Sequence, residues 1–160
     1  MAEQKTNVMR LLEQKKIKYT AREYPHGDEP VDGVTVAESL GQPVEKVFKT
    51  LVARGASKKI YVFDIPVAEE LDLKKAAKAV GEKSIAMIHV KEITELTGYV
   101  RGGCSPVGMK KQYPTVFHES CLAEDTIMVS AGKIGYQAEL APEELIKLTR
   151  ASTADIIVDK

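Results

Sequence analysis

The sequence predicts an α+β fold built on a largely antiparallel or mixed, strongly curved sheet. Segments rich in β-branched and aromatic residues follow one another through short turns more often than through helices. The chain has 160 residues, a length that suits one domain with one core and one cleft, burying roughly 70% of its unfolded surface. No internal repeat or low-complexity linker interrupts the order. A doubly wound parallel sheet fits these observations less well.

The N-terminal third is expected to form a helix, a strand and a loop. Apolar residues at helical spacing predict a helix over residues 6–16, and Thr6 is a suitable cap. Residues 18–24 alternate enough to form a strand. Residues 25–33 are rich in proline, glycine and aspartate and form the clearest loop of this region.

The central part of the chain is expected to contain a short helix, a hairpin and a longer helix. The segment from Thr35 to Glu38 has the pattern of a capping box, so a two-turn helix should start there and end at Gly41. Residues 47–53 and 59–65 predict a β-hairpin. The next helix spans residues 73–80. The remaining elements are a strand at 85–90, a short helix at 91–96, strands at 115–118, 126–130 and 134–140, a helix that Pro142 starts and that runs to 149, and a strand at 156–158.

Composition excludes several classes of function. The 23 Lys and Arg balance 23 Asp and Glu, so bulk attraction to DNA or to an anionic membrane has no basis. No 18-residue apolar run or signal-peptide pattern is present, which predicts a cytoplasmic protein. Because Trp is absent and Phe and Tyr are few, an aromatic base-stacking platform is poorly supplied.

The sequence also supports no cofactor. Cys104 and Cys121 have neither CxxC nor metal-ligand spacing, and the three histidines form no HxxH pair, so neither a disulfide framework nor a zinc site is predicted. The phosphate-binding glycine motifs of nucleotide-binding folds are missing.

A glycine-rich loop over residues 98–108 is the clearest candidate for a site. Adjacent Gly102 and Gly103 would let the backbone approach a ligand and direct N–H groups at an anion or a developing oxyanion. Arg101, together with Lys110 and Lys111 just after the loop, gives residues 98–111 a local charge of +3. A mobile hairpin loop would explain the same composition.

Lys49 is the second candidate, because it lies in the middle of a predicted strand. It is either a solvated lysine on the outer face of that strand or an ammonium held over a cleft to stabilise negative charge. Residues 130–135 form a second small-residue turn, which is either a hairpin or the floor of a pocket. Cys104 could act as a thiol nucleophile with His118 or His89, but a space-filling role fits its spacing better.

Taken together, these motifs resemble the YbaK-type Cys-tRNA(Pro) deacylases, free-standing relatives of the editing domain inserted in bacterial prolyl-tRNA synthetase. The resemblance runs in the same order along nearly the whole chain. It rests on Phe48-Lys49-Thr50-Leu51, residues 73–78, the G-G-x-S-P-x-G segment within residues 98–108, the V-S-x-G-x-x-G segment at 129–135, and Glu139-Leu140-Ala141-Pro142.

The resemblance implies one editing domain over residues 1–160, with a curved, nearly barrel-like mixed sheet surrounded by helices. The implied activity is removal of a wrong amino acid from tRNA(Pro). A synthetase pocket built for proline cannot strongly reject smaller amino acids, so a second site must remove them. The implied partners are the aminoacylated 3′ end of mischarged tRNA(Pro) and prolyl-tRNA synthetase, with no membrane and no DNA.

The resemblance also assigns site residues. Lys49 becomes the residue on which activity depends, positioning the ester or stabilising charge near the terminal adenosine. Gly102 and Gly103 would supply room and N–H groups around the scissile carbonyl. The other substrate-binding residues that it implies are Tyr24, Thr50, Ser105, Ser130 and Gly132. For cysteine-specific members the substrate thiol attacks its own ester, so Cys104, at the variable x of G-G-x-S-P, is not a catalyst.

Two departures from the family pattern bear on the substrate. Gln137 stands where the family often has an acid, and the family's aromatic residue after Tyr24 is replaced, the candidates being Val31 and Asp32. Cysteine is expected as the preferred amino acid and alanine as the next. The alternatives are a deacylase of another small amino acid, a non-catalytic module that binds the tRNA 3′ end or the synthetase, and a Cys104 hydrolase.

Overall fold

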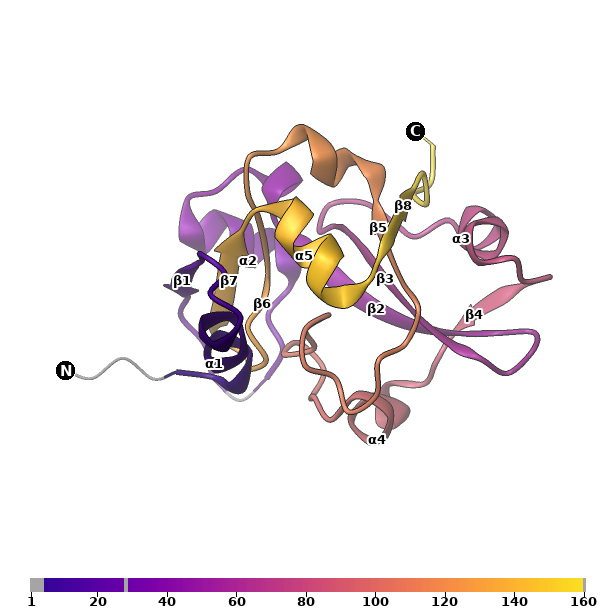
Figure 1. Ribbon diagram of the computed structural model, residues 1–160, viewed down its shortest axis with the longest axis horizontal. Helices are drawn as coiled ribbons and strands as arrows, with labels where there is room; N and C mark the ends of the chain where they lie inside the picture. Colours follow the sequence, from indigo (N-terminus) through magenta and orange to yellow (C-terminus); the bar gives the residue numbers. More distant parts are fainter. Residues whose placement is uncertain (1–4, 28, 160) are drawn as a thin grey trace.

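The computed structural model describes residues 5–27 and 29–159, and its strands form two sheets that meet at the start of β2 (Figure 1). One sheet has the order β4-β2-β3-β5-β8 and the other β1-β7-β6. The strands are β1 (Thr20–Glu23), β2 (Phe48–Gly55), β3 (Ile60–Pro66), β4 (Ile85–Met87), β5 (Thr115–His118), β6 (Ile127–Ser130), β7 (Tyr136–Leu140) and β8 (Ser152–Ala154).

The pairing confirms the predicted α+β class with a mixed, mostly antiparallel sheet. β2 pairs antiparallel with β3 and β4, and β7 pairs antiparallel with β1 and β6, whereas β5 is parallel to both of its neighbours. A parallel bridge between Val47 and Met128 joins the two sheets. The sheets curve around a shared core without closing into a barrel within the described part of the chain.

Five α-helices and three short 3₁₀ turns surround the described sheets. They are α1 (Asn7–Gln14), α2 (Gly33–Leu40), α3 (Leu73–Val80), α4 (Ile93–Thr97) and α5 (Pro142–Thr149), with η1 (Val44–Lys46), η2 (Val90–Glu92) and η3 (Glu119–Ala123). Thr6 caps α1 as predicted, since its side chain accepts a hydrogen bond from the Met9 N–H. None of these helices is long and apolar enough to cross a membrane.

Several predicted boundaries are wrong: β4 ends at Met87 and not at residue 90, β7 begins at Tyr136 and not at residue 134, and two other elements differ for reasons that the structure shows. α2 begins at Gly33, because the Asp32 carboxylate accepts the Thr35 N–H at 3.3 Å and caps the helix before the expected capping box. The last strand is β8 rather than residues 156–158: the apolar Ile156 is fully buried in the core under α3, while the preceding residues pair with β5. Residues 156–158 pair instead with residues 70–72, outside the two sheets, through an antiparallel bridge between Leu71 and Ile157.

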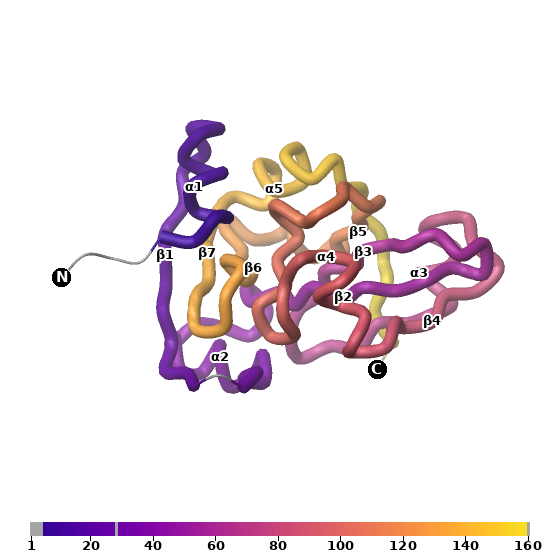
Figure 2. Tube along the Cα trace, turned by 90° about the horizontal axis from the view of Figure 1, so that it is seen from below, coloured from indigo at the N-terminus to yellow at the C-terminus, as the bar shows by residue number. Residues whose placement is uncertain are grey.

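The core has three parts that hold the two sheets and their helices together. α1 and α5 pack on the three-stranded sheet, α3 packs on the five-stranded sheet, and α2 covers the junction near Val47 and Met128. In Figure 2 the β2–β3 hairpin, α3 and β4 project at one end of the molecule, and α1, β1 and α2 lie at the other. The junction between these ends is where the cavity forms.

Candidate functional site

A cavity of about 370 Å³ lies against the free edge of β2. Five consecutive residues of β2, from Phe48 to Val52, line it. Successive side chains of a strand point to opposite faces, so consecutive residues can line one cavity only when it wraps around the strand's edge. β4 pairs with residues 53–55 and Val47 bridges Met128, which leaves this stretch of the edge without a partner strand in the described chain.

At the open edge, the backbone N–H and C=O of one residue point into the cavity. The Val52 carbonyl accepts the Ile88 N–H at 3.3 Å on this edge, whereas the Val47 carbonyl accepts the Val67 N–H at 2.8 Å on the opposite one. The N–H and C=O of one residue point to the same edge of a strand, and successive residues alternate between the two edges. The N–H and C=O of Thr50 therefore face the cavity.

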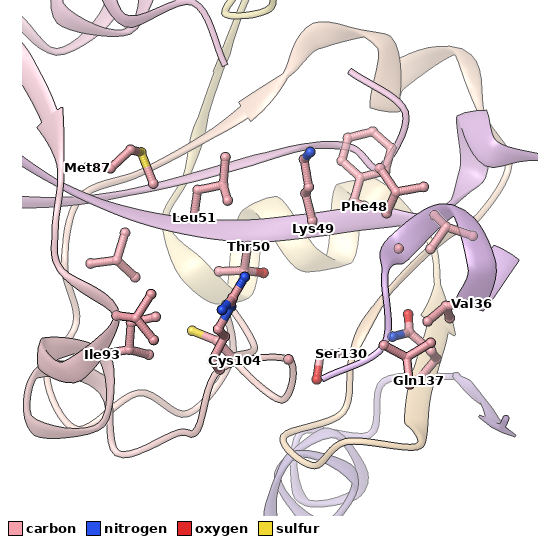
Figure 3. A pocket seen from close by; sticks show the side chains of 18 of the residues that line it. Val36, Phe48, Lys49, Thr50, Leu51, Met87, Ile93, Cys104, Ser130 and Gln137 are labelled. Carbon is pink, nitrogen blue, oxygen red and sulfur yellow. The ribbon is translucent and has the colours of Figure 1, made fainter. Parts of the chain in front are cut away.

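Lys49 and Thr50 approach the cavity from opposite faces of β2. Lys49 is paired in register with Ile65, and Thr50 with Asp64. Figure 3 shows the two side chains leaving the strand in opposite directions, with Thr50 directed toward Cys104. Lys49 is half-buried and forms no ion pair with any acid of the described residues. Its ammonium is thus available to a ligand.

Asp64 lies beneath the cavity and was not singled out from the sequence. It is 0% exposed, and its Oδ1 accepts the Thr50 hydroxyl at 2.6 Å, while Oδ2 has no hydrogen-bond partner in the part of the chain that the structure describes. Burial raises the pKa of this carboxyl to about 8, and the hydrogen bond from Thr50 opposes the rise. A lone acid in the otherwise apolar run from Ile60 to Pro66 was the signal that could have identified it.

Cys104 lines the cavity but lacks the surroundings of a nucleophile. Burial raises the pKa of its thiol to about 12, with the nearby Asp64 adding to the effect and a hydrogen bond with Thr97 opposing it. His118 does not line the cavity. Its Nδ1 accepts the Ile156 N–H at 3.3 Å, and burial lowers the pKa of the imidazole. These contacts fit a space-filling Cys104.

The paired glycines allow two loops to approach each other closely. Gly102 has φ +86°, and a Cβ on it would lie 2.8 Å from the Cβ of Pro30. A Cβ on Gly103 would lie 3.1 Å from the backbone nitrogen of Ile134. Gly102 lines the cavity and Gly103 does not. Gly103 therefore holds the loop against the 133–135 turn.

The other predicted residues divide into two groups. Tyr24 and Ser130 line the cavity. Ser105 is fully buried away from it, and its Oγ accepts the Val107 N–H at 3.2 Å. Gly132 borders a separate hollow of about 490 Å³ beside α1, but its N–H donates to Ser130 Oγ at 3.2 Å. Ser105 and Gly132 thus support loops around the cavity and do not line it.

The structure also shows where the two departures from the family pattern lie relative to the cavity. Val31 lines the cavity, whereas Asp32 caps α2. Gln137 lines the cavity beside Ser130, its partner in the β6–β7 register, and its buried Oε1 has no hydrogen-bond partner. The charged lining residues of the described chain are Lys49 and Arg101, so this cavity favours an anionic or polar ligand. Its opposite wall is apolar and consists of Met87, Ile88, Val90 and Ile93.

Comparisons with known proteins identify the family of this chain. Residues 29–148 match the model of the aminoacyl-tRNA editing domain. The chain is 48% identical over 154 residues to EbsC of Enterococcus faecalis, named as a proposed Cys-tRNA(Pro)/Cys-tRNA(Cys) deacylase, covering 96% of this chain and 94% of that protein. A crystal structure described as a proposed trans-editing enzyme for prolyl tRNA synthetase superposes with a TM-score of 0.82 at 27% identity, covering 98% of this chain and 100% of that one.

A proline–tRNA ligase of Thermosipho africanus is 34% identical over 76 residues, which are 48% of this chain and 13% of the ligase. The resemblance inferred from the motifs is therefore confirmed by a family match over most of the chain and by a relative of nearly equal length. This chain belongs to the aminoacyl-tRNA editing domain family.

Proposed function

We propose that this protein is a cytoplasmic trans-editing deacylase that removes cysteine from mischarged Cys-tRNA(Pro). The observation that carries the proposal is the cavity at the open β2 edge, which combines an unpaired Lys49 ammonium with backbone hydrogen-bonding groups and offers no activated nucleophile of its own. Such a cavity suits a reaction in which the substrate supplies the nucleophile.

Cyclisation of the substrate is the reaction that we propose. The cysteinyl thiol sulfur bonds to the carbonyl carbon of its own ester, and the bond from that carbon to the ribose oxygen breaks. The thiol proton passes to the ribose oxygen, which leaves a cyclic thioester and uncharged tRNA. The protein contributes proximity, because a confined aminoacyl group samples the reactive conformation more often than a free one.

Lys49 has the central role in this reaction. Negative charge develops on the carbonyl oxygen and the attacking sulfur, and the Lys49 ammonium at the cavity would stabilise it. The Thr50 peptide N–H and the backbone at Gly102 are further donors for that charge, and Tyr24 and Ser130 border the same space. Gly103, Ser105 and Gly132 would act by fixing the loops.

The tRNA is expected to bind weakly and mainly through its aminoacylated 3′ end. Zero net charge gives no general attraction to phosphates, so Arg101 at the cavity and the nearby Lys110 and Lys111 would supply the local contacts. Prolyl-tRNA synthetase is the partner expected to deliver the mischarged tRNA. The predicted binding is lost as the salt concentration rises, and tight binding at high salt would contradict it.

A panel of charged tRNAs tests the proposal. We expect selective loss of the ester from Cys-tRNA(Pro), a slower loss from Ala-tRNA(Pro), and none from Pro-tRNA(Pro). Cys-tRNA(Cys) belongs in the panel because it shows whether the tRNA body contributes to selectivity. If no ester is lost faster than without protein, the proposal fails, and binding without turnover would instead indicate a tRNA-binding module.

A further inference from the structure

Asp64 is a buried acid whose charge has no counterpart among the described residues. No cation of the described residues forms an ion pair with it, and Oδ2 accepts no hydrogen bond. Lys49 lies on the opposite face of β2, across from Ile65. Ionising a buried carboxyl group that has no partner is unfavourable. The site therefore holds an acid that a cationic ligand could satisfy.

The cavity needs a way to bind the positive end of its substrate. Every aminoacyl ester carries an α-amino group next to the scissile carbonyl, and this amine is at least partly protonated near neutral pH. The charged groups that line the cavity in the described chain, Lys49 and Arg101, would repel it. Asp64 is an acid that lies one hydrogen bond behind the cavity wall, through Thr50.

Thr50 connects the cavity with that acid. Its hydroxyl donates to Asp64 Oδ1 at 2.6 Å, so the lone pairs of Oγ1 remain free to accept a hydrogen bond from a ligand. The Thr50 carbonyl faces the same cavity from the open edge of β2. One residue thus presents two acceptors with a carboxyl group directly behind them.

Resting on the proposed function, we infer that Thr50 receives the α-ammonium group of the aminoacyl ester, and that Asp64 is a positioning residue that orients the Thr50 hydroxyl and balances the ammonium charge. Asp64 acts through Thr50 and does not touch the reacting atoms. The α-amino group is thereby held on the Thr50 side of β2, while the ester oxygen is left to the Lys49 ammonium on the other side.

The electrostatics around Asp64 agree with this arrangement. Burial raises the pKa of Asp64 to about 8, so the acid is mostly neutral until a cation arrives. The titratable groups that interact with it are the thiols of Cys104 and Cys121, whose pKa values burial raises to about 12 and about 11. Both thiols stay neutral near neutral pH. The ammonium of the substrate is then the charge that favours ionisation of Asp64.

Gln137 is the competing acceptor. It is 6% exposed, it lines the cavity, and its Oε1 is also without a partner. Gln137 is neutral, however, and it lies on β7 opposite Ser130 of β6, not on β2. A test must therefore distinguish the two positions.

The test compares substrates with and without the α-amino group. Cys-tRNA(Pro) is set against 3-mercaptopropionyl-tRNA(Pro), which keeps the thiol and the ester, and Ala-tRNA(Pro) is set against propionyl-tRNA(Pro). For the wild-type protein we expect kcat/KM to favour the amine-bearing member of each pair by roughly 10- to 100-fold. Asp64→Asn and Thr50→Val should reduce this preference to within about threefold, and Thr50→Ser, which keeps the hydroxyl, should restore it. Glu82→Gln is the matched control, because Glu82 follows α3 and contacts the tip of the β2–β3 hairpin, away from the cavity.

An unchanged preference in Asp64→Asn would overturn the inference. If the preference is then lost in Gln137→Leu, Gln137 is the acceptor of the ammonium group. Binding of 3′-cysteinylamino-3′-deoxyadenosine, an amide that resists cleavage, and of its deamino counterpart gives the same comparison by calorimetry. This measurement separates the two proposals. Absence of turnover with any ester defeats the proposed function, whereas equal binding of the two amides defeats the assignment of Thr50 and Asp64.

Discussion

At one end of the β2–β3 hairpin the polar groups have partners, and at the other end they lack them within the described chain. Near the tip, Arg54 pairs with Glu92 at 3.2 Å, and Glu82 accepts hydrogen bonds from Ser57 and from the Tyr61 hydroxyl, the latter at 2.6 Å. At the cavity end, Lys49 has no ionic partner in the described chain and Asp64 leaves one oxygen unpaired.

This difference separates groups that stabilise the fold from groups kept for a ligand. A satisfied polar group contributes to stability, whereas a buried one without partners costs free energy. Changes at the tip should therefore affect unfolding more than turnover, and changes at the cavity end should do the reverse. The following predictions test that division.

Lys49→Ala should have the largest effect. Removing the ammonium that stabilises developing charge is expected to reduce kcat/KM on Cys-tRNA(Pro) by about 10²–10³. The unfolding midpoint should change little, because Lys49 forms no ion pair in the described structure. Lys78→Ala, an exposed lysine on α3, is the control. Full activity of Lys49→Ala would remove the main distinction between the two ends.

Asp64→Asn should change how stability depends on pH. The pKa of Asp64 is raised from 3.8 to about 8 in the folded protein, so the folded state binds the proton more tightly than the unfolded chain does. Its contribution is present at acid pH and is lost as pH rises toward 8. Between about pH 6 and about pH 8 the wild-type protein should lose about 2 kcal/mol that Asp64→Asn retains. Urea unfolding at several pH values measures this, and parallel curves for the two proteins would refute it.

Glu82→Gln should weaken the tip and spare the reaction. Hydrogen bonds from Ser57 and Tyr61 lower the pKa of Glu82, so its contribution is present at neutral pH and is lost as pH falls through the folded-state pKa. We expect a lower midpoint of thermal unfolding at neutral pH and unchanged deacylation. Comparable losses of stability and of activity would show that the tip is not separate from the site.

Cys104→Ala should have the smallest effect. Its thiol is protonated at neutral pH because burial raises its pKa to about 12, so it cannot supply a thiolate. Deacylation is expected to stay within about threefold of wild type. If the cysteine change costs as much as Lys49→Ala, a thiol mechanism would replace substrate cyclisation.

The sequence predicted the fold class and the principal side chain of the site. Lys49 stood out as a cation within an apolar strand, and Gly102 as one of two adjacent glycines, which allow a close approach of the backbone. Lys49 and Gly102 both line the cavity. Element order followed from hydrophobic periodicity, because burial of one face imposes that period on both helices and strands. The cap at Asp32 was missed because Asp32 and Thr35 are both residues that can cap a helix ending at Gly41.

The pairing of strands and the packing of loops determine the remaining features of the site, which the sequence does not reveal. Asp64 became visible through its register with Thr50, since a lone acid in a strand carries no sign of what lies opposite it. Gly132 and Ser105 belong to the same motifs as lining residues and yet face away from the cavity. Which side of a turn faces a cavity depends on how two distant loops pack, and one chain segment does not encode that alone.

The open edge of β2 also bears on how the protein avoids self-association. Unpaired strand edges are templates on which other chains can add and begin to aggregate. Here the unpaired stretch from residue 49 to residue 51 is about 10 Å long and ends at the Val47–Met128 bridge on one side and at β4 on the other. An edge this short and recessed can bond a group the size of one amino acid, but it cannot take up a strand from another molecule.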